Sequence, residues 1–156
     1  MRRAYLSLGS NIGDRAEHLA SGIAIVAQGD AFRTSSVYET EPVGGVAQDD
    51  YWNMVVEVST DATPRELLER ARRAETARGR VRDVHWGPRT LDVDVLLVGD
   101  ERSDDPEIVV PHPRMYERSF VLIPLHELAP DVVTRAQLDA GNGAVTRLGT
   151  LESLRE

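Results

Sequence analysis

The chain has 156 residues, of which 41% are hydrophobic and 28% charged, as expected for one globular domain with its own core. No apolar run approaches the ~18 residues needed to span a membrane, and no N-terminal leader signal is present, so we expect a cytoplasmic protein. The absence of cysteine excludes thiolate chemistry, and the net charge of −8 argues against a nucleic-acid-binding surface.

Every one of the 18 basic residues is arginine, and the sequence contains no lysine. This excludes a phosphate-binding loop of the Gly-Lys-Ser/Thr type and any lysine Schiff base. A phosphate group would have to be bound by guanidinium groups, whose geometry suits bidentate contacts to phosphate oxygens. Small polyphosphates therefore remain candidate ligands although the whole chain is acidic.

The first half of the chain predicts strands separated by one helix. The elements in order are a strand over 3–8, a turn over 9–14, a helix that ends before Gly29, and strands over 32–38 and 52–59. Asp14 is the candidate N-cap of the helix, because its carboxylate can accept from the backbone of the first turn. A loop with glycine and proline over 39–50 separates the last two strands.

The second half begins with the clearest helix start in the sequence. Thr63 as N-cap, Pro64 at the first helical position and Glu66 three residues after the cap form the pattern of a capping box. The helix is predicted to end at Gly79. A charged loop, a strand from residue 92, a short strand over 108–110 and a helix over 116–128 follow. After residue 130 the signal weakens to a small strand pair or partial disorder.

The order strand, helix, strand, strand, helix, strand is that of the split β-α-β arrangement in ferredoxin-like domains. We therefore expect an α+β fold, with a mainly antiparallel sheet and helices packed on it. One domain would cover residues 1–156, with its core over about 3–130 and a weakly predicted tail over 131–156.

Two acids stand at the start of the strand from residue 92. In an extended chain Asp92 and Asp94 share one face, while Leu91, Val93 and Val95 share the other. A half-solvated strand with an acidic outer face would also give this pattern. Residues 95–98 are apolar on both faces, however, which places the acids near the core, where carboxylates need a cation or hydrogen-bond donors. Two such carboxylates can bind magnesium for displacement at phosphorus.

Other polar side chains of the sequence are suited to bind phosphate or a flat heterocycle. Arg80, Arg82 and Arg89 precede the acid strand and could clamp phosphates, although each could equally be a solvated surface arginine. His112, between two prolines, could donate to a phosphate oxygen. Asn53 offers both donors and an acceptor to a heterocyclic edge.

Several motifs together resemble the 6-hydroxymethyl-7,8-dihydropterin pyrophosphokinases of the folate pathway. The most specific are residues 86–94 (WGPRTLDVD) and 110–115 (VPHPRM). Residues 8–11 (LGSN), 36–40 (SVYET), 51–53 (YWN) and 118–120 (RSF) occur in the same order as in the family. The resemblance covers about residues 4–130.

The resemblance implies diphosphoryl transfer from ATP to the hydroxymethyl group of a reduced pterin, with release of AMP and with two magnesium ions. Asp92 and Asp94 match the metal ligands, and Asp94 is the candidate proton acceptor. The remaining matches are catalytic Arg80, Arg82, Arg89 and His112, ATP-binding Glu75, Arg82, Trp86, His112 and Arg118, and pterin-binding Thr40, Val43, Tyr51, Asn53 and Phe120.

The resemblance also implies small-molecule substrates and a monomer, with no nucleic acid or membrane partner. Two other functions stay open on the residues themselves. One is a different magnesium-dependent phosphohydrolase or nucleotidyl transferase that uses the same acid pair. The other is a non-catalytic nucleotide-binding module, in which the acids would not support turnover.

Overall fold

The computed structural model describes residues 1–41, 49–79 and 90–155, and the fold is α+β as expected. Within these residues the main sheet has six strands, β1 (Arg2–Ser10), β2 (Phe32–Thr34), β3 (Val37–Thr40), β4 (Tyr51–Thr60), β5 (Asp92–Val98) and β8 (Thr146–Gly149). A separate two-stranded sheet pairs β6 (Ser103–Asp105) with β7 (Ile108–Val110). The helical elements are α1 (Arg15–Ala27), α2 (Pro64–Ala77), the 3-10 turn η1 (Met115–Glu117), α3 (Ser119–Leu128), α4 (Arg135–Ala140) and α5 (Leu151–Leu154).

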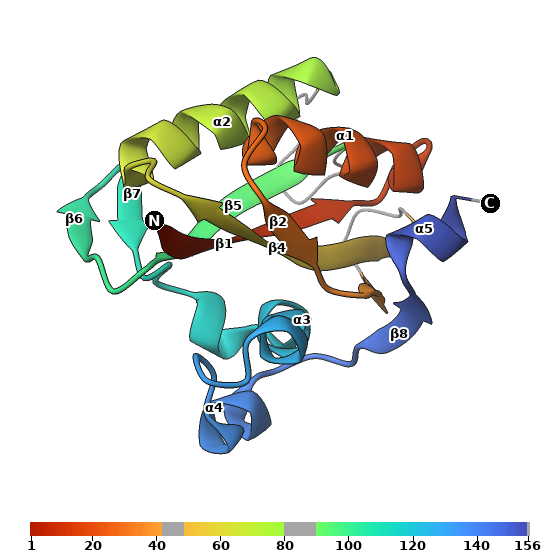
Figure 1. The fold of residues 1–156 in the computed structure, drawn as a ribbon. Helices are drawn as coiled ribbons and strands as arrows, with labels where there is room; N and C mark the ends of the chain where they lie inside the picture. Colours follow the sequence, from red (N-terminus) through yellow and green to blue (C-terminus); the bar gives the residue numbers. More distant parts are fainter. Residues whose placement is uncertain (42–48, 80–89, 156) are drawn as a thin grey trace.

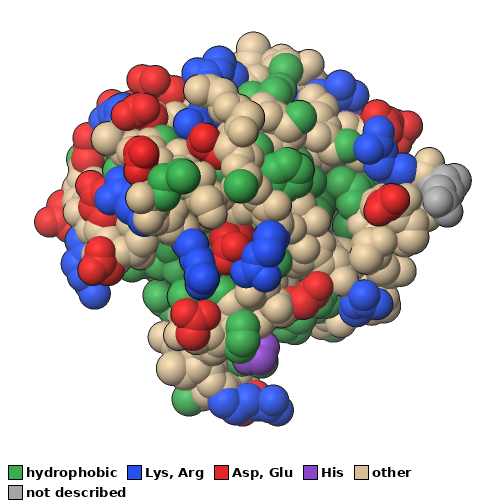
Figure 2. All heavy atoms as spheres, viewed as in Figure 1, with side chains coloured by type: hydrophobic (Ala, Val, Ile, Leu, Met, Phe, Trp, Pro, Cys, Tyr) green, Lys and Arg blue, Asp and Glu red, His purple; other side chains and the backbone are tan. Residues whose placement is uncertain are grey.

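The helices cover the sheet on both faces. Figure 1 shows α1 and α2 side by side on one face, with α3 and α4 on the opposite face. The strand order is β5-β1-β4-β3-β8, with β2 also paired to β4, and all these pairs are antiparallel. In the same view, Figure 2 shows basic and acidic side chains intermingled over the surface.

Two apolar clusters fill the space between the sheet and its helices. Alternate residues of β4 divide between them: Met54 and Val56 pack toward α1 and α2, whereas Val55 packs toward α3. This division follows from the period of two along a strand. In the described part of the chain, no helix combines the length and apolarity that crossing a membrane would require.

The predicted helix starts are confirmed. The Asp14 side chain accepts from the backbone nitrogen of Glu17 at the start of α1. At the start of α2, Thr63 and Glu66 form the reciprocal pair of a capping box, and Pro64 occupies the first turn. These caps satisfy backbone donors that have no partner within the helix.

The predicted single strand over 32–38 is wrong, because it is interrupted at two serines. Ser35 lies between β2 and β3, and its hydroxyl accepts from the backbone nitrogen of Val55 at 2.9 Å. The backbone nitrogen of Ser36 turns away to the carboxylate of Glu127 in α3. A serine side chain thus replaces a backbone partner at the break, which frees the next amide for a contact outside the sheet.

Three further boundaries differ from the predictions. β1 continues through Gly9 and Ser10, where a turn was expected, because both residues pair with β4. The helix expected over 116–128 begins as η1 and is separated from α3 by the extended residue Arg118. The segment after residue 130 forms α4, β8 and α5, and β8 extends the sheet beside β3.

A buried acid joins three strands on the α3 face. Glu57 is 4% exposed and accepts from the Tyr5 hydroxyl at 2.8 Å and from Arg33 at 2.8 and 2.9 Å. The hydrogen bonds from Arg33 lower the pKa of Glu57 against the opposing effect of burial. Burial and the bond to Glu57 raise the pKa of Tyr5 to about 12. Arg33 also donates to the backbone oxygen of Leu128 at the end of α3.

We expect Glu57→Gln to lower the free energy of unfolding by about 1–3 kcal/mol near neutral pH, because the variant weakens hydrogen bonds to a charged acceptor. The folded-state pKa of Glu57 lies below its unfolded value of about 4.3. Its contribution is therefore complete above that value and is lost as the pH falls through the folded pKa. Urea unfolding over this pH range should show the two proteins converging in stability; a difference independent of pH would contradict the assignment.

Candidate active site

Four strands place one row of residues across the α3 face of the sheet. In the strand register Asp92 lies opposite Gly9, Gly9 opposite Asn53, and Asn53 opposite Tyr38. Residues that are paired in register point to the same face. We call this set the cross-strand row. Its centre carries no side chain, because the residue between the acid and the amide is glycine.

Glycine is required at the centre of the row by its neighbour on β4. A Cβ atom on Gly9 would lie 2.8 Å from Oδ1 of Asn53 and 3.6 Å from a ring carbon of Tyr51. The first of these distances is shorter than van der Waals contact. The absence of a side chain at Gly9 thus lets the Asn53 amide lie across β1.

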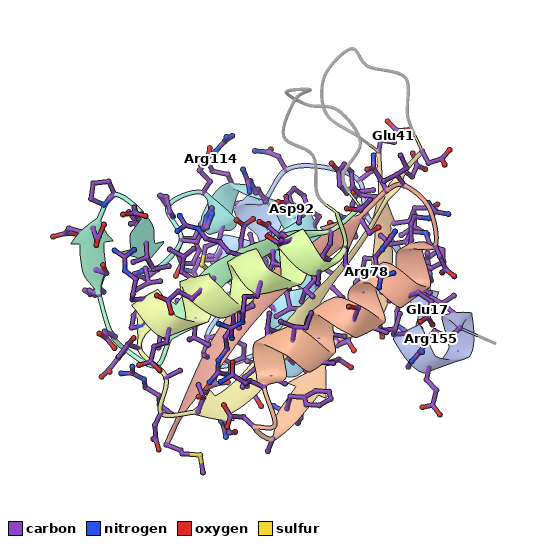
Figure 3. The ribbon with its side chains drawn as sticks, turned by 90° about the horizontal axis from the view of Figure 1, so that it is seen from above. Glu17, Glu41, Arg78, Asp92, Arg114 and Arg155 are labelled. Atoms are coloured by element: carbon purple, nitrogen blue, oxygen red, sulfur yellow. The ribbon has the colours of Figure 1, made fainter. Side chains whose placement is uncertain are left out.

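The two acids of β5 share the face that the alternation predicts. Asp94 lies opposite Ser7 of β1, next along from the pair of Asp92 with Gly9. Both carboxylates are partly exposed, while Val93 between them is buried in the core under α1 and α2. In Figure 3 the labelled Asp92, Arg114 and Glu41 all lie in the upper half of the view.

The carboxylate of Glu75 binds the backbone of β5 at the residue between these two acids. Glu75 lies in α2, is 5% exposed, and accepts from the backbone nitrogen of Val93 at 2.9 Å. Among the described strands β5 lies at the edge of the sheet, so this amide points to a side where none of them pairs. A buried side chain therefore supplies the hydrogen bond that a neighbouring strand would make.

His112 lies beside the second acid of β5. Its Nε2 is 3.9 Å from Oδ1 of Asp94, and its backbone nitrogen donates to the oxygen of Leu96 at 2.9 Å. The backbone nitrogen of Arg114 donates to Nδ1 of His112 at 3.2 Å. Because Nδ1 is an acceptor, the neutral ring carries its proton on Nε2, on the side of Asp94.

The surroundings of His112 favour the neutral ring. Burial lowers the pKa of His112 most, and the positive charges of Arg118 and Arg114 lower it further, against the opposing charge of Asp92. The side chain is thus a neutral hydrogen-bond donor near neutral pH.

The polar residues expected to bind a heterocycle come together on β3 and β4. Asn53 is 7% exposed, and its Nδ2 donates to the hydroxyl of Thr40 at 2.8 Å. Thr40 pairs in register with Tyr51, which is partly buried. Since Nδ2 is directed to Thr40, Oδ1 of Asn53 is the atom nearest to Gly9.

The helix over this face contributes an aromatic ring and a cation. Phe120, in the first turn of α3, packs against the cluster that contains Tyr5 and Val55. The guanidinium of Arg118 lies 5.6 Å from the centre of the Phe120 ring. Both side chains therefore stand on the face that carries the cross-strand row.

Five of the sequence-predicted site residues lie outside the described residues. They are Val43, Arg80, Arg82, Trp86 and Arg89. Among residues 1–41, 49–79 and 90–155, no group of three or more histidine, aspartate or glutamate side chains could hold a metal ion. A metal bound to Asp92 and Asp94 would need further ligands.

Sequence reasoning gave Gly9 and Tyr38 only as members of motifs and did not assign them a function. It also missed Arg15 and Asn11, which donate to the backbone oxygens of Asp50 at 2.8 Å and of Asp49 at 3.0 Å. These contacts fix the chain immediately before Tyr51. Of the two, only Asn11 lies in a recognisable motif, the LGSN segment.

Comparisons with known proteins show which family the sequence matches. Residues 5–130 match the family model described as 7,8-dihydro-6-hydroxymethylpterin-pyrophosphokinase (HPPK). The chain is 48% identical over 136 residues to a 2-amino-4-hydroxy-6-hydroxymethyldihydropteridine pyrophosphokinase of Bacillus subtilis, covering 85% of this chain and 81% of that protein. It is 46% identical over 142 residues to the protein of the same name from Methylorubrum extorquens, covering 85% and 86%. It is 40% identical over 136 residues to that of Haemophilus influenzae, covering 85% of each.

The match spans the strands and helices that carry the cross-strand row, the acids of β5 and the first turn of α3. The chain therefore belongs to the HPPK family.

Proposed function

We propose that the α3 face of the sheet, around the cross-strand row, is where this pyrophosphokinase transfers the diphosphate of ATP to the hydroxymethyl group of 6-hydroxymethyl-7,8-dihydropterin in folate biosynthesis. One observation carries the proposal: Asp92 and Asn53 flank Gly9 in a single register row. Two strand spacings, about 10 Å, separate β5 from β4. That span suits phosphates and metal at one end and a heterocycle at the other.

Asp92 and Asp94 fit a magnesium site completed by substrate. Magnesium is commonly bound by one or two carboxylates together with water and phosphate oxygens. The absence of a third acidic or histidine ligand among the described residues agrees with that arrangement. We propose two magnesium ions, which when bound would neutralise phosphate charge and lower the pKa of the attacking hydroxyl.

The side chains around the acids would position and stabilise the reacting groups. The pterin hydroxyl oxygen attacks the β-phosphorus of ATP in line, the new O–P bond forms, and the bond to the bridging oxygen breaks so that AMP leaves. We assign the hydroxyl proton to Asp94. His112 donates through Nε2–H to a phosphate oxygen, and Arg118 adds positive charge on the same side.

Further roles are proposed from the family resemblance. Arg80, Arg82 and Arg89 would bind the triphosphate, and Trp86 and Glu75 would line the ATP site. On the pterin side, Tyr51 and Phe120 would stack on the ring, while Asn53, Thr40 and the backbone at Val43 would hydrogen-bond to its edge.

The architecture supports two further proposals. The core follows the chain order β1, α1, β2 with β3, β4, α2, β5. Its strands pair in the order β5-β1-β4-β3, which is consistent with a ferredoxin-like topology. The pairing of β8 with β3 supports one pyrophosphokinase domain over residues 1–156. We expect it to act in the cytoplasm as a monomer on small-molecule substrates.

The test of the pterin assignment is a pair of substitutions whose effects should depend on each other. Asn53→Ala should raise the Kd for 6-hydroxymethyl-7,8-dihydropterin roughly tenfold to a hundredfold, because it removes hydrogen bonds to the heterocycle. Gly9→Ala should weaken binding roughly tenfold by displacing the Asn53 amide. In the Asn53→Ala background, Gly9→Ala should therefore add little.

Binding can be measured by pterin fluorescence, with a non-hydrolysable ATP analogue titrated as the control. The Kd for the analogue should change by less than twofold in all three variants. Phosphorus NMR of the wild-type reaction should show AMP and a pterin diphosphate. Unchanged pterin affinity in Asn53→Ala, or ADP as the product, would overturn the proposal.

A further inference from the structure

The carboxylate of Glu127 fastens the last turn of α3 to the sheet beside the site. It accepts from the backbone nitrogen of Ser36 at 3.0 and 3.1 Å, and from the Ser36 hydroxyl at 3.1 Å. It also accepts from the hydroxyl of Tyr38 at 2.5 Å. One side chain thus holds both ends of the segment that leads from the serine break into β3.

Strand β8 completes this cluster from the other side. Arg147 lies opposite Tyr38 in the strand register, and its Nε donates to the Ser36 hydroxyl at 3.0 Å. Burial and the hydrogen bond to Glu127 raise the pKa of Tyr38 well above its usual range, so its hydroxyl remains a donor. The cross-strand row therefore continues from Asn53 through Tyr38 to Arg147.

Tyr38 connects this cluster with the proposed pterin-binding residues. It is 6% exposed, pairs with Asn53 on β4, and stands two residues before Thr40 on the same face of β3. Asn53 in turn donates to Thr40. A displacement of Tyr38 would move both members of that hydrogen bond.

The same helix carries Phe120 at its other end. Phe120 and Glu127 are seven residues apart, which is two turns, so they lie on one side of α3 with their Cα atoms about 10 Å apart. Glu127 holds that side of the helix against β3 through Ser36 and Tyr38. Pro124 removes one backbone hydrogen bond within α3, but the buried Leu122 and Leu125 pack this part of the helix into the core. Fixing the last turn of α3 therefore also constrains the distance of its first turn from the sheet.

We propose that Glu127, acting through Tyr38, is a positioning residue for pterin: it sets the separation between Phe120 on α3 and the Asn53–Thr40 pair on the sheet. The inference rests on the proposed function of those three residues. It also explains a tyrosine in this place, since packing alone would need only phenylalanine, whereas a buried hydroxyl requires a partner.

Three variants test the proposal: Tyr38→Phe, Glu127→Gln and the double variant. Each single variant should raise the Kd and KM for 6-hydroxymethyl-7,8-dihydropterin roughly fivefold, because each removes part of one hydrogen-bonded connection. The double variant should cost little more than either single one. The Kd for a non-hydrolysable ATP analogue should change by less than twofold.

Asp30→Asn is the matched control, because it is also an acid-to-amide change that weakens an ion pair. Asp30 accepts from Arg70 of α2 at 3.1 Å, and Arg70 is buried on the other side of the sheet. This variant should lower the urea unfolding midpoint without changing the pterin Kd. If Glu127 served only to stabilise the fold, Glu127→Gln would likewise lower the urea unfolding midpoint and leave the pterin Kd unchanged.

Pterin affinities within twofold of wild type in both single variants would overturn the proposal. If Asn53→Ala still weakened pterin binding in that case, the proposed function would stand and only the role of Glu127 would fail. If Asn53→Ala had no effect either, both would fail. Losses of pterin affinity that are non-additive in the double variant, with the affinity for the ATP analogue retained, would support the proposed role of Glu127.

Discussion

Asp94→Asn is expected to lower kcat/KM by a thousandfold or more. Asp94 is the proposed metal ligand and proton acceptor, so loss of its charge should remove several kcal/mol of transition-state stabilisation. Asp92→Asn should be nearly as severe. The variants should remain folded, because both side chains are partly exposed and asparagine has a similar shape.

The measurement is AMP formation over a range of magnesium concentrations. Asp100→Asn is the matched control, because Asp100 is exposed in the turn just after β5 and should leave turnover unchanged. Both acid variants should need more magnesium for half-maximal rate. Turnover within tenfold of wild type for Asp94→Asn would contradict the assignment of Asp94 as a metal ligand and proton acceptor.

The acid strand could be predicted because its information is local. The alternation of Asp92 and Asp94 with Leu91, Val93 and Val95 fixes their faces whatever the partner strand is. The structure confirms those faces. The caps at Asp14 and Thr63 were predictable for the same reason, since cap and partner are three residues apart.

The serine break and the contacts of Glu127 could not be predicted, because their partners are distant in the sequence. Ser36 and Glu127 are 91 residues apart, and the chain gives no local sign that an amide between two strands will bind a helix carboxylate. Gly9 shows the same limit. Its motif marked it as notable, but only the register with Asn53 shows why a side chain cannot stand there.

The role of Glu75 combines these two kinds of information. The proposal from the family resemblance is that Glu75 lines the ATP site, whereas in the structure it accepts a hydrogen bond from the backbone of Val93, between the two acids. The two roles are separable by experiment, because they depend on different properties of the side chain. A contact with ATP depends on the carboxylate charge, while holding the strand requires only an acceptor oxygen.

Glu75→Leu is therefore expected to lower kcat roughly a hundredfold and to raise the magnesium concentration for half-maximal rate. The reason is that the Val93 amide loses its acceptor, so the position of β5 and its two acids is no longer fixed. Glu75→Gln keeps an acceptor oxygen, so its kcat should stay within about tenfold of wild type. Glu69→Leu, an exposed position of the same helix, is the matched control and should leave both quantities unchanged.

If both Glu75 variants instead weakened ATP binding equally and left the magnesium dependence unaltered, Glu75 would act through ATP and the strand contact would be incidental to catalysis. A large loss of kcat in Glu75→Leu but not in Glu75→Gln would mean that the buried Glu75 carboxylate positions both metal-ligand candidates through the backbone amide between them.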